Sequence, residues 1–434
     1  MSPSSAPLVS RYTYRLHAQA AVLEGILAGV LVTYDVVARK TLGASQFQLV
    51  ILTMAPGSSW LLSLFFANQF QGYDRRSLFL WAGLVGRLPL FAVAWMHGVW
   101  PFLAVLVLHG FVQTALIPAQ NALYQQNYDA QSRGRLFGRA SVWGCAATAV
   151  TALGSGLLMD MQPLSSDWLG WLVGRDAFRW LYPAAGIAGL GACLVYGSIR
   201  LRKSGRSAPH APIEAAAMRY WPPHEVVLPP FRRAFEAIRT TLIQDAGFRR
   251  FEVALFVYGL GFMVMQPVFA VLFVDELHMK YSDASLAKGV VFYVVNVAAL
   301  AAAGRMYDRL GLERLGARAT VLLAVFATAM AFVQTPAQAV AAFSLFGLAM
   351  AALNIAWSMG PIHYAPPGQA ARYMSVHVAL VGLRALLGHP LGGVVAHGAG
   401  STRPAFVVAA GLFGIATVLM MRAERLSPRR KAAA

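Results

Sequence analysis

The sequence predicts an all-α integral membrane protein with twelve transmembrane helices in two pseudo-symmetric six-helix halves. Composition is the first reason, because 58% of the 434 residues are hydrophobic and only 12% are charged, as is typical of membrane proteins. The second reason is a succession of apolar runs long enough to cross a bilayer as helices. The third is a set of charged turns that recurs in the two halves of the chain.

Short polar turns separate the apolar runs. Backbone groups in a turn cannot be satisfied inside hydrocarbon, so each turn is expected to lie at a membrane face, with helices on either side of it. We place the runs at 17–38, 46–66, 78–98, 101–124, 136–159, 179–199, 250–273, 286–304, 316–334, 338–361, 373–396 and 403–421.

Two kinds of charged turn occur twice at nearly the same spacing. One follows the second run at 72–76 and the eighth run at 304–314. The other follows the fourth run at 128–135 and the tenth run at 364–372. Both pairs are separated by roughly 235 residues, which indicates that one half was duplicated and repeated in parallel.

The turn at 304–311 reads G-x-x-x-D-R-x-G and follows the second helix of its half. It resembles the signature loop of the major facilitator superfamily, and the helix number, the half-repeat and the central linker extend this resemblance over nearly the whole chain. Two departures stand out. Leu312 and Glu313 occupy the positions of the family's basic pair, and Phe70 stands where the first-half copy should begin with glycine.

The predicted division of the chain follows its polar stretches. Residues 1–200 form the N-terminal six-helix half, and residues 248–434 form the C-terminal half with a basic cytoplasmic tail. Residues 201–247 form a cytoplasmic linker, whose final part has apolar residues at three- and four-residue spacing and is expected to be an amphipathic surface helix.

The formal net charge of +18 reflects the distribution of basic residues along the chain. Most lysines and arginines fall on the side of the predicted membrane that holds the N-terminus, which places both termini in the cytoplasm by the positive-inside rule. The surplus of basic residues is therefore explained by membrane topology, and nucleic acid is not an expected partner. We expect a monomeric multi-pass protein of a bacterial inner (plasma) membrane.

No cofactor, metal site or enzymatic centre is expected. Cys145 and Cys193 both lie within apolar runs, where small buried residues are common. The chain contains no nucleotide-binding loop and neither a D-D-x-x-D nor an H-E-x-x-H motif. A membrane-embedded enzyme or a channel is therefore only a remote alternative.

Helix one carries two acids, Glu24 and Asp35, which are about three turns apart and so share one face. A carboxylate in hydrocarbon is costly, so each should meet a partner or a cavity. Asp35 has one available partner at i+4, Arg39, in a helix-surface pair. Glu24 has no cation nearby in sequence and is our first candidate for taking up a coupling proton.

Two arginines lie near the middle of predicted helices, Arg87 in the third and Arg384 in the eleventh. Snorkelling cannot easily bring either guanidinium to the membrane surface. Each is expected either to hold helices together or to contact the substrate. We favour Arg384 as the charge complement of the substrate.

The resemblance implies a cavity between the halves, lined mainly by the first, fourth, seventh and tenth helices. Alternating access of this cavity to the two sides would carry the substrate. The candidate residues for binding substrate or proton are Glu24, Asp35, Arg87, His109, Gln113, Asn121, Gln266, Asn354, Trp357 and Arg384.

These residues favour secondary active transport of a small organic solute with proton coupling, because aromatic, amide and a few ionisable groups suit such a ligand. The membrane-embedded arginines favour an organic anion, whereas Glu24 and Asp35 favour a cationic or amphipathic compound. A multidrug efflux antiporter is the alternative within the same class.

The resemblance also implies a cytoplasmic gate. In the family, the signature-loop aspartate of one half contacts the start of a helix in the other half when the inner side is shut. A helix start has free N–H groups and a positive dipole end, so it attracts a carboxylate. The residues expected to form this gate are Asp74, Arg75, Arg135, Arg139, Asp308, Arg309 and Arg372.

Overall fold

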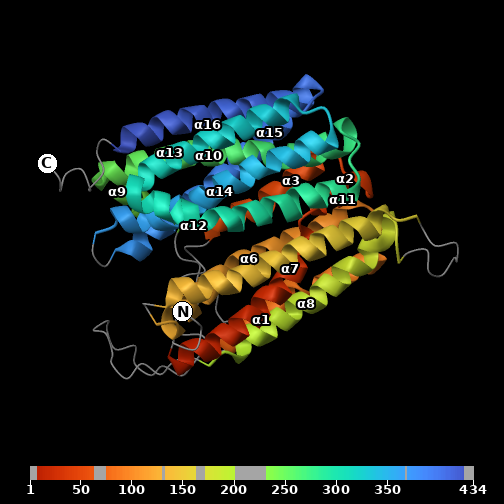
Figure 1. The fold of residues 1–434 in the computed structure, drawn as a ribbon, viewed down its shortest axis with the longest axis horizontal. Helices are drawn as coiled ribbons and strands as arrows, with labels where there is room; N and C mark the ends of the chain where they lie inside the picture. Colours follow the sequence, from red (N-terminus) through yellow and green to blue (C-terminus); the bar gives the residue numbers. More distant parts are fainter. Residues whose placement is uncertain are drawn as a thin grey trace.

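We analysed a computed structural model of the chain. It describes residues 7–62, 75–129, 132–162, 172–200, 231–366 and 369–424. Every regular element within these ranges is helical, which confirms the predicted all-α class. Figure 1 shows the helices running side by side along the length of the molecule.

The first half of the chain contains six successive helical spans. Their elements are α1 (Leu8–Leu31), α2 (Tyr34–Lys40), α3 (Gln46–Ser58), η2 (Ser59–Leu62), α5 (Arg75–Gly86), η3 (Leu88–Trp95), α6 (Val99–Asn127), α7 (Arg133–Asp160), η4 (Arg175–Ala177) and α8 (Phe178–Ser198). Here α1 with α2, α3 with η2, α5 with η3, and η4 with α8 each belong to one span.

The second half repeats this arrangement after a linker helix. Its elements are α9 (Phe231–Gln244), α10 (Ala246–Val271), η5 (Leu272–Glu276), α11 (Tyr281–Ser285), η6 (Leu286–Val291), α12 (Phe292–Leu310), α13 (Leu312–Phe332), α14 (Pro336–Tyr364), α15 (Ala370–Ala399) and α16 (Arg403–Glu424). α9 coincides with the predicted amphipathic linker helix, while the domain boundaries proposed from the sequence stay a prediction.

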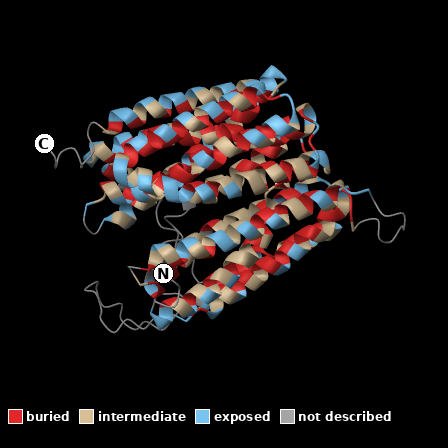
Figure 2. Ribbon diagram, viewed as in Figure 1, coloured by how far each residue is buried: buried red, intermediate tan, exposed pale blue. Residues whose placement is uncertain are grey.

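Ten helices within the described residues are long and apolar enough to cross a membrane. The remaining two predicted spans coincide with α3 and α6, so the arrangement agrees with twelve. Figure 2 shows buried residues on the faces that the helices turn toward one another and exposed residues on the outer faces. Exposed apolar side chains on these outer faces are what contact with lipid tails requires.

Alternate connections define two ends of the bundle. The chain turns at 41–45, 96–98, 277–280, 333–335 and 400–402 at one end, which we call the far end. α1 begins and α16 ends at the other, which we call the near end. Polar caps begin two helices at the far end, where Ser45 and Thr335 each form a reciprocal capping box with a glutamine three residues later.

Small residues bring α1 and α7 into close contact. A Cβ added to Gly25 would overlap the carbonyl oxygen of Gly144, and one added to Gly29 would lie 2.7 Å from that of Thr148. Without a hydrophobic force between helices in lipid, such backbone approach is a main source of association. The glycine-rich fifth run therefore packs against the helix that carries Glu24.

This contact predicts a selective loss of stability. Gly25→Ala forces α1 away from α7 and should lower the free energy of unfolding by about 1–3 kcal/mol. Gly138→Ala on α7 is the matched control, because nothing lies within 4 Å of an added Cβ there and alanine favours the helix. Thermal unfolding in detergent measures both, and equal melting temperatures for the two variants would contradict the packing argument.

Candidate functional site

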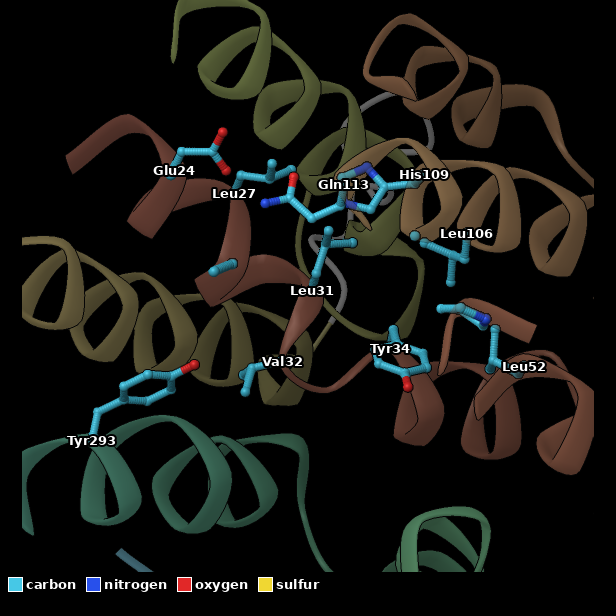
Figure 3. A pocket seen from close by; sticks show the side chains of 13 residues that line it. Glu24, Leu27, Leu31, Val32, Tyr34, Leu52, Leu106, His109, Gln113 and Tyr293 are labelled. Atoms are coloured by element: carbon cyan, nitrogen blue, oxygen red, sulfur yellow. The ribbon is translucent and has the colours of Figure 1, made fainter. Parts of the chain in front are cut away.

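A cavity of about 320 Å³ opens beside α1, α3 and α6, and one residue of α12 faces it from the other half (Figure 3). Its polar lining residues are Glu24, His109 and Gln113 from the first half and the phenol of Tyr293 from the second. The rest of the lining is mainly apolar: Leu27, Ala28, Leu31, Val32, Tyr34, Leu52, Pro56, Leu106 and Gly110. Three predicted site residues therefore share one cavity.

Arg87 lies behind this cavity and is fully buried. Its guanidinium donates to both carboxylate oxygens of Glu24, at 3.3 and 3.4 Å, and to the amide oxygen of Gln113. The side chain of Glu24 is 21% exposed, so the pair reaches the cavity through its carboxylate. The cation that Glu24 lacks nearby in its own helix is thus supplied by the third span.

His109 completes the cluster. Its Nδ1 lies 3.0 Å from the carbonyl oxygen of Gly86, and both ring nitrogens lie 2.9 Å from one guanidinium nitrogen of Arg87. A carbonyl oxygen can only accept, so Nδ1 carries a hydrogen and Nε2 is left to accept from Arg87. The cluster therefore combines one carboxylate, one guanidinium and a neutral imidazole, and its formal charge is close to zero.

The candidates of the second half lie outside this cavity lining. Gln266 and Trp357 are half-buried, Asn354 is exposed, and the indole of Trp357 meets that of Trp60 edge-on at 6.1 Å. Trp357 therefore contacts the first half, because Trp60 belongs to η2. The side chain of Asn121 falls outside the described residues.

Arg384 is buried beside α10. It donates to the carbonyl oxygen of Leu255 at 2.8 Å, and its guanidinium lies 5.6 Å from the ring centre of Tyr258. Gly259 leaves the space for it, since a Cβ there would overlap the arginine side chain. These contacts pack α15 against α10, and the role of Arg384 toward a substrate stays a prediction.

Sequence reasoning missed a buried acid in the second half, Glu252. Its carboxylate lies 2.9 Å from Nδ1 of His377, and both side chains are almost fully buried. The His377 ring packs edge-on against Trp357 at 5.1 Å. Glu252 lies close to the predicted start of its span, where an acid can be solvated at the interface, so nothing in the local pattern singled it out.

Two ion pairs join the halves toward the far end. Asp35 pairs with Lys288 at 2.7 Å, and Arg39 pairs with Asp275 at 2.6 Å. The expected helix-surface pair between Asp35 and Arg39 is therefore wrong, because each side chain finds a partner from the other half instead. Asp35 is 4% exposed at its side chain and Lys288 15%, so this pair is the more buried of the two.

Further polar contacts strengthen the same junction. The carboxylate of Asp160 accepts from the backbone N–H groups of Tyr281 and Ser282, both at 2.8 Å. Lys40 donates to the carbonyl oxygen of Met279, and the hydroxyls of Thr41 and Tyr281 lie 2.7 Å apart. We call these contacts and the two ion pairs the far-end clasp.

The second-half partners of both ion pairs lie in π-helical turns. Asp275 belongs to η5, and Lys288 belongs to η6, each within an otherwise α-helical span. A π-helical turn is wider than an α-helical turn and shifts the direction of the side chains that follow. Hydrophobic periodicity carries no sign of such turns, which is one reason why the clasp was not predicted.

Glycines on α7 and α12 show where close packing between the two halves occurs. Gly138 on α7 and Gly304 on α12 have nothing within 4 Å of an added Cβ. At the far end, by contrast, a Cβ on Gly156 of α7 would lie 2.8 Å from the carbonyl oxygen of Tyr281. Of these three glycines, the one at the far end packs against the other half.

The predicted gate residues that the structure describes lie at the near end. Asp308 and Arg309 are exposed, with no ion pair among the described residues. Arg372 donates to the hydroxyl of Thr240. The contacts expected between the signature-loop aspartates and the helix starts of the other half therefore stay a prediction, made for a state in which the near end is closed. Arg135 and Arg139 are half-buried at the start of α7. Asp74 and the side chain of Arg75 lie outside the described residues.

Comparison with known proteins gives a family match for the second half of the chain and a fold match for nearly all of it. The second half of the chain, residues 252–434, matches the model of the Major Facilitator Superfamily. Nearly the whole chain also has the fold of solved transporters of that superfamily. The second half of the chain therefore matches this superfamily, and nearly the whole chain has the fold of its transporters. With ten helices long and apolar enough to cross a membrane, the chain is a multi-pass membrane protein.

Similar solved structures cover nearly the full length of the chain. A mutant of the nucleoside transporter NupG superposes with a TM-score of 0.68 at 13% identity, covering 94% of this chain and 99% of its own. A bacterial homolog of the human lysosomal transporter Spinster, in an inward-facing unoccupied conformation, superposes with a TM-score of 0.66 at 16% sequence identity. The match covers 97% of this chain and 98% of that protein. A D-xylose-proton symporter superposes with a TM-score of 0.65 at 14% sequence identity, and the match covers 94% of this chain and 96% of the symporter.

Identities this low establish a shared fold and no finer similarity. No curated protein matches the chain. The cavity and the clasp must therefore be interpreted from this chain's own residues.

The far-end clasp predicts how the two halves separate. Asp35→Asn leaves the Lys288 ammonium without its counter-charge, which costs about 3–5 kcal/mol when a buried pair is broken. Asp275→Asn should cost no more than about 1 kcal/mol, because that pair is more exposed. Opening of the far end is measured from the rate at which a maleimide labels a cysteine at Ala152, which packs against Gly289, in a variant without Cys145 and Cys193.

We expect faster labelling in Asp35→Asn than in Asp275→Asn. The exchanged pair Asp35→Lys with Lys288→Asp should restore slow labelling, because the opposite charges face each other again. Equal labelling rates in all of these variants would show that the ion pairs do not hold the far end shut.

Proposed function

We propose that this protein is a secondary active transporter that moves a small organic solute by alternating access, with protons as the coupling ion. The observation that carries the proposal is the cavity beside α1, α3 and α6, into which Tyr293 reaches from the other half. Its polar groups can orient a solute while the surrounding apolar residues cover the remainder. The far-end clasp provides a barrier on one side of this cavity.

The composition of the cavity supports a solute without a strong net charge. Arg87 is already paired with Glu24, so its positive charge is largely compensated. Gln113, His109 and the carboxylate of Glu24 present donors and acceptors suited to hydroxyl, amide or amine groups. An organic anion would need Arg384, which is directed to the Leu255 carbonyl and the Tyr258 ring in this conformation.

Glu24 is our proposed site of proton uptake. It lines the cavity and is partly exposed there, whereas Glu252 is enclosed with His377. A proton bound by Glu24 would weaken its bond to Arg87, since only the carboxylate attracts the guanidinium strongly. Protonation would thereby free a guanidinium next to the solute, which links the two binding events.

A multidrug efflux antiporter is the second candidate. It is favoured by the apolar side chains that make up most of the cavity lining. Such a surface suits amphipathic compounds that vary in shape, and it makes few demands on hydrogen bonding. The two candidates differ in the range of compounds that should compete for the cavity.

We further propose a bacterial inner membrane as the location, with both termini in the cytoplasm. The excess of basic residues on the near-end turns and tails supports this orientation. The far-end clasp would then lie on the outer side, and this conformation would be closed to the outside.

A transport assay in proteoliposomes tests the function. A thermal-shift screen of metabolites and drugs first selects a ligand, and counterflow of that labelled ligand then distinguishes a transporter from a channel, which cannot exchange one solute for another. We expect counterflow with one narrow class of solute. Counterflow with many unrelated amphipathic compounds would favour the efflux antiporter, and ligand binding without any counterflow would contradict the proposal.

The same assay tests Glu24. Glu24→Gln should abolish accumulation driven by a proton gradient but leave counterflow, because the amide cannot take up a proton yet keeps much of the side chain's shape. Glu252→Gln is the matched control and should still accumulate solute. Normal accumulation by Glu24→Gln would exclude it as the coupling site.

A further inference from the structure

A second hollow, separate from the solute cavity, lies between α12, α13 and α14. It has a volume of about 400 Å³, and Arg318 is the charged residue among those that line it. The lining is otherwise apolar and rich in alanine: Ala299, Ala302, Ala303, Met306, Leu315, Ala319, Val321, Leu322, Leu348 and Ala352. We call this hollow the α12–α13 groove.

The length of the groove matches one leaflet of a bilayer. Its lining runs from Met306 back to Ala299 on α12 and from Leu315 to Leu322 on α13, beside the near-end turn at Gly311. At 1.5 Å per residue, the deepest lining residues lie roughly 15–18 Å from that turn. Half of a hydrocarbon core is about 15 Å thick, so an acyl chain of the near-end leaflet fits the groove lengthwise.

Besides Arg318, which lines the groove, further arginines lie close to the near-end turn in the sequence. Arg305, Arg309 and Arg318 are exposed, and none forms a salt bridge within the part of the chain that the structure describes. Two acids lie between them in the sequence: Asp308 is exposed, and Glu313 is buried and accepts a hydrogen bond from the hydroxyl of Tyr364. One helical turn before Arg318, Arg314 is also exposed but pairs with Glu424 at 2.8 Å.

We propose that the α12–α13 groove binds an anionic phospholipid from the near-end leaflet, with one acyl chain in the groove and its phosphate on Arg318. A guanidinium suits a phosphate because its fork donates two parallel hydrogen bonds. Its aliphatic stem can lie along the apolar wall while the charged end reaches the headgroup level. Basic pockets between transmembrane helices favour anionic headgroups in this way.

Selectivity for a net negative headgroup follows from the surrounding charges. Arg305, Arg309 and Arg318 with the acids Asp308 and Glu313 leave a net charge of about +1 around the near-end turn beside the groove, which attracts an anion at short range. A zwitterionic lipid offers the same phosphate and the same chain, but its quaternary ammonium is repelled by the neighbouring arginines. Phosphatidylglycerol and phosphatidylcholine with identical acyl chains therefore make a matched pair of probes.

The test measures retention of each lipid by the full-length protein with native mass spectrometry, together with the melting temperature in detergent. Wild type should retain phosphatidylglycerol roughly tenfold more strongly than phosphatidylcholine and be stabilised by it. Arg318→Gln should lose this preference. Arg314→Gln should keep it, because that arginine is engaged by Glu424.

A second variant tests the groove rather than the charge. Ala302→Phe places a large side chain in the groove from an exposed position on α12, so it should displace the acyl chain without disturbing the core. Equal retention of both lipids by wild type, equal losses in Arg314→Gln and Arg318→Gln, or undiminished retention by Ala302→Phe would each overturn the proposal.

Discussion

The arrangement of the two halves depends on the far-end clasp. Asp35 and Lys288 form its most buried pair, and Asp160 accepts from two backbone N–H groups at the start of α11. Breaking such a pair exposes charges to a medium that solvates them poorly, unless water enters as the halves part. The clasp is therefore strong in a dry junction and weak in a hydrated one, which is the behaviour a reversible barrier requires.

Within the first half, the same rule of charge compensation shapes the cavity. Arg87 is buried at the centre, and Glu24, Gln113 and His109 converge on it from two other spans. Charged groups without partners would be costly at this depth, so the cluster holds the helices together while Glu24, Gln113 and His109 also line the cavity. The structural role of Arg87 is therefore compatible with the solute binding proposed for this cavity.

Much of the fold was predictable because a helix that spans a membrane needs a long run of apolar residues, which is visible in the sequence. Apolar length located the spans, and the recurring turns indicated the two halves. Contacts between side chains of different spans were harder to predict from the sequence. Glu24 and Arg87 were both singled out as candidates, but their contact depends on how the helices are rotated relative to one another. Lys288 and Asp275 were missed because they lie in π-helical turns, and Asp35 was matched to its nearest neighbour in sequence instead of its neighbour in space.

The central claim is that the far end and the near end open in alternation. Spin-label distances measure this directly, with one label pair at Phe47 and Gln334 for the far end and another at Gly134 and Met421 for the near end, in protein lacking Cys145 and Cys193. On adding solute or changing pH, the account predicts that one distance distribution lengthens as the other shortens. Distances that stay constant, or that change together in the same direction, would contradict it.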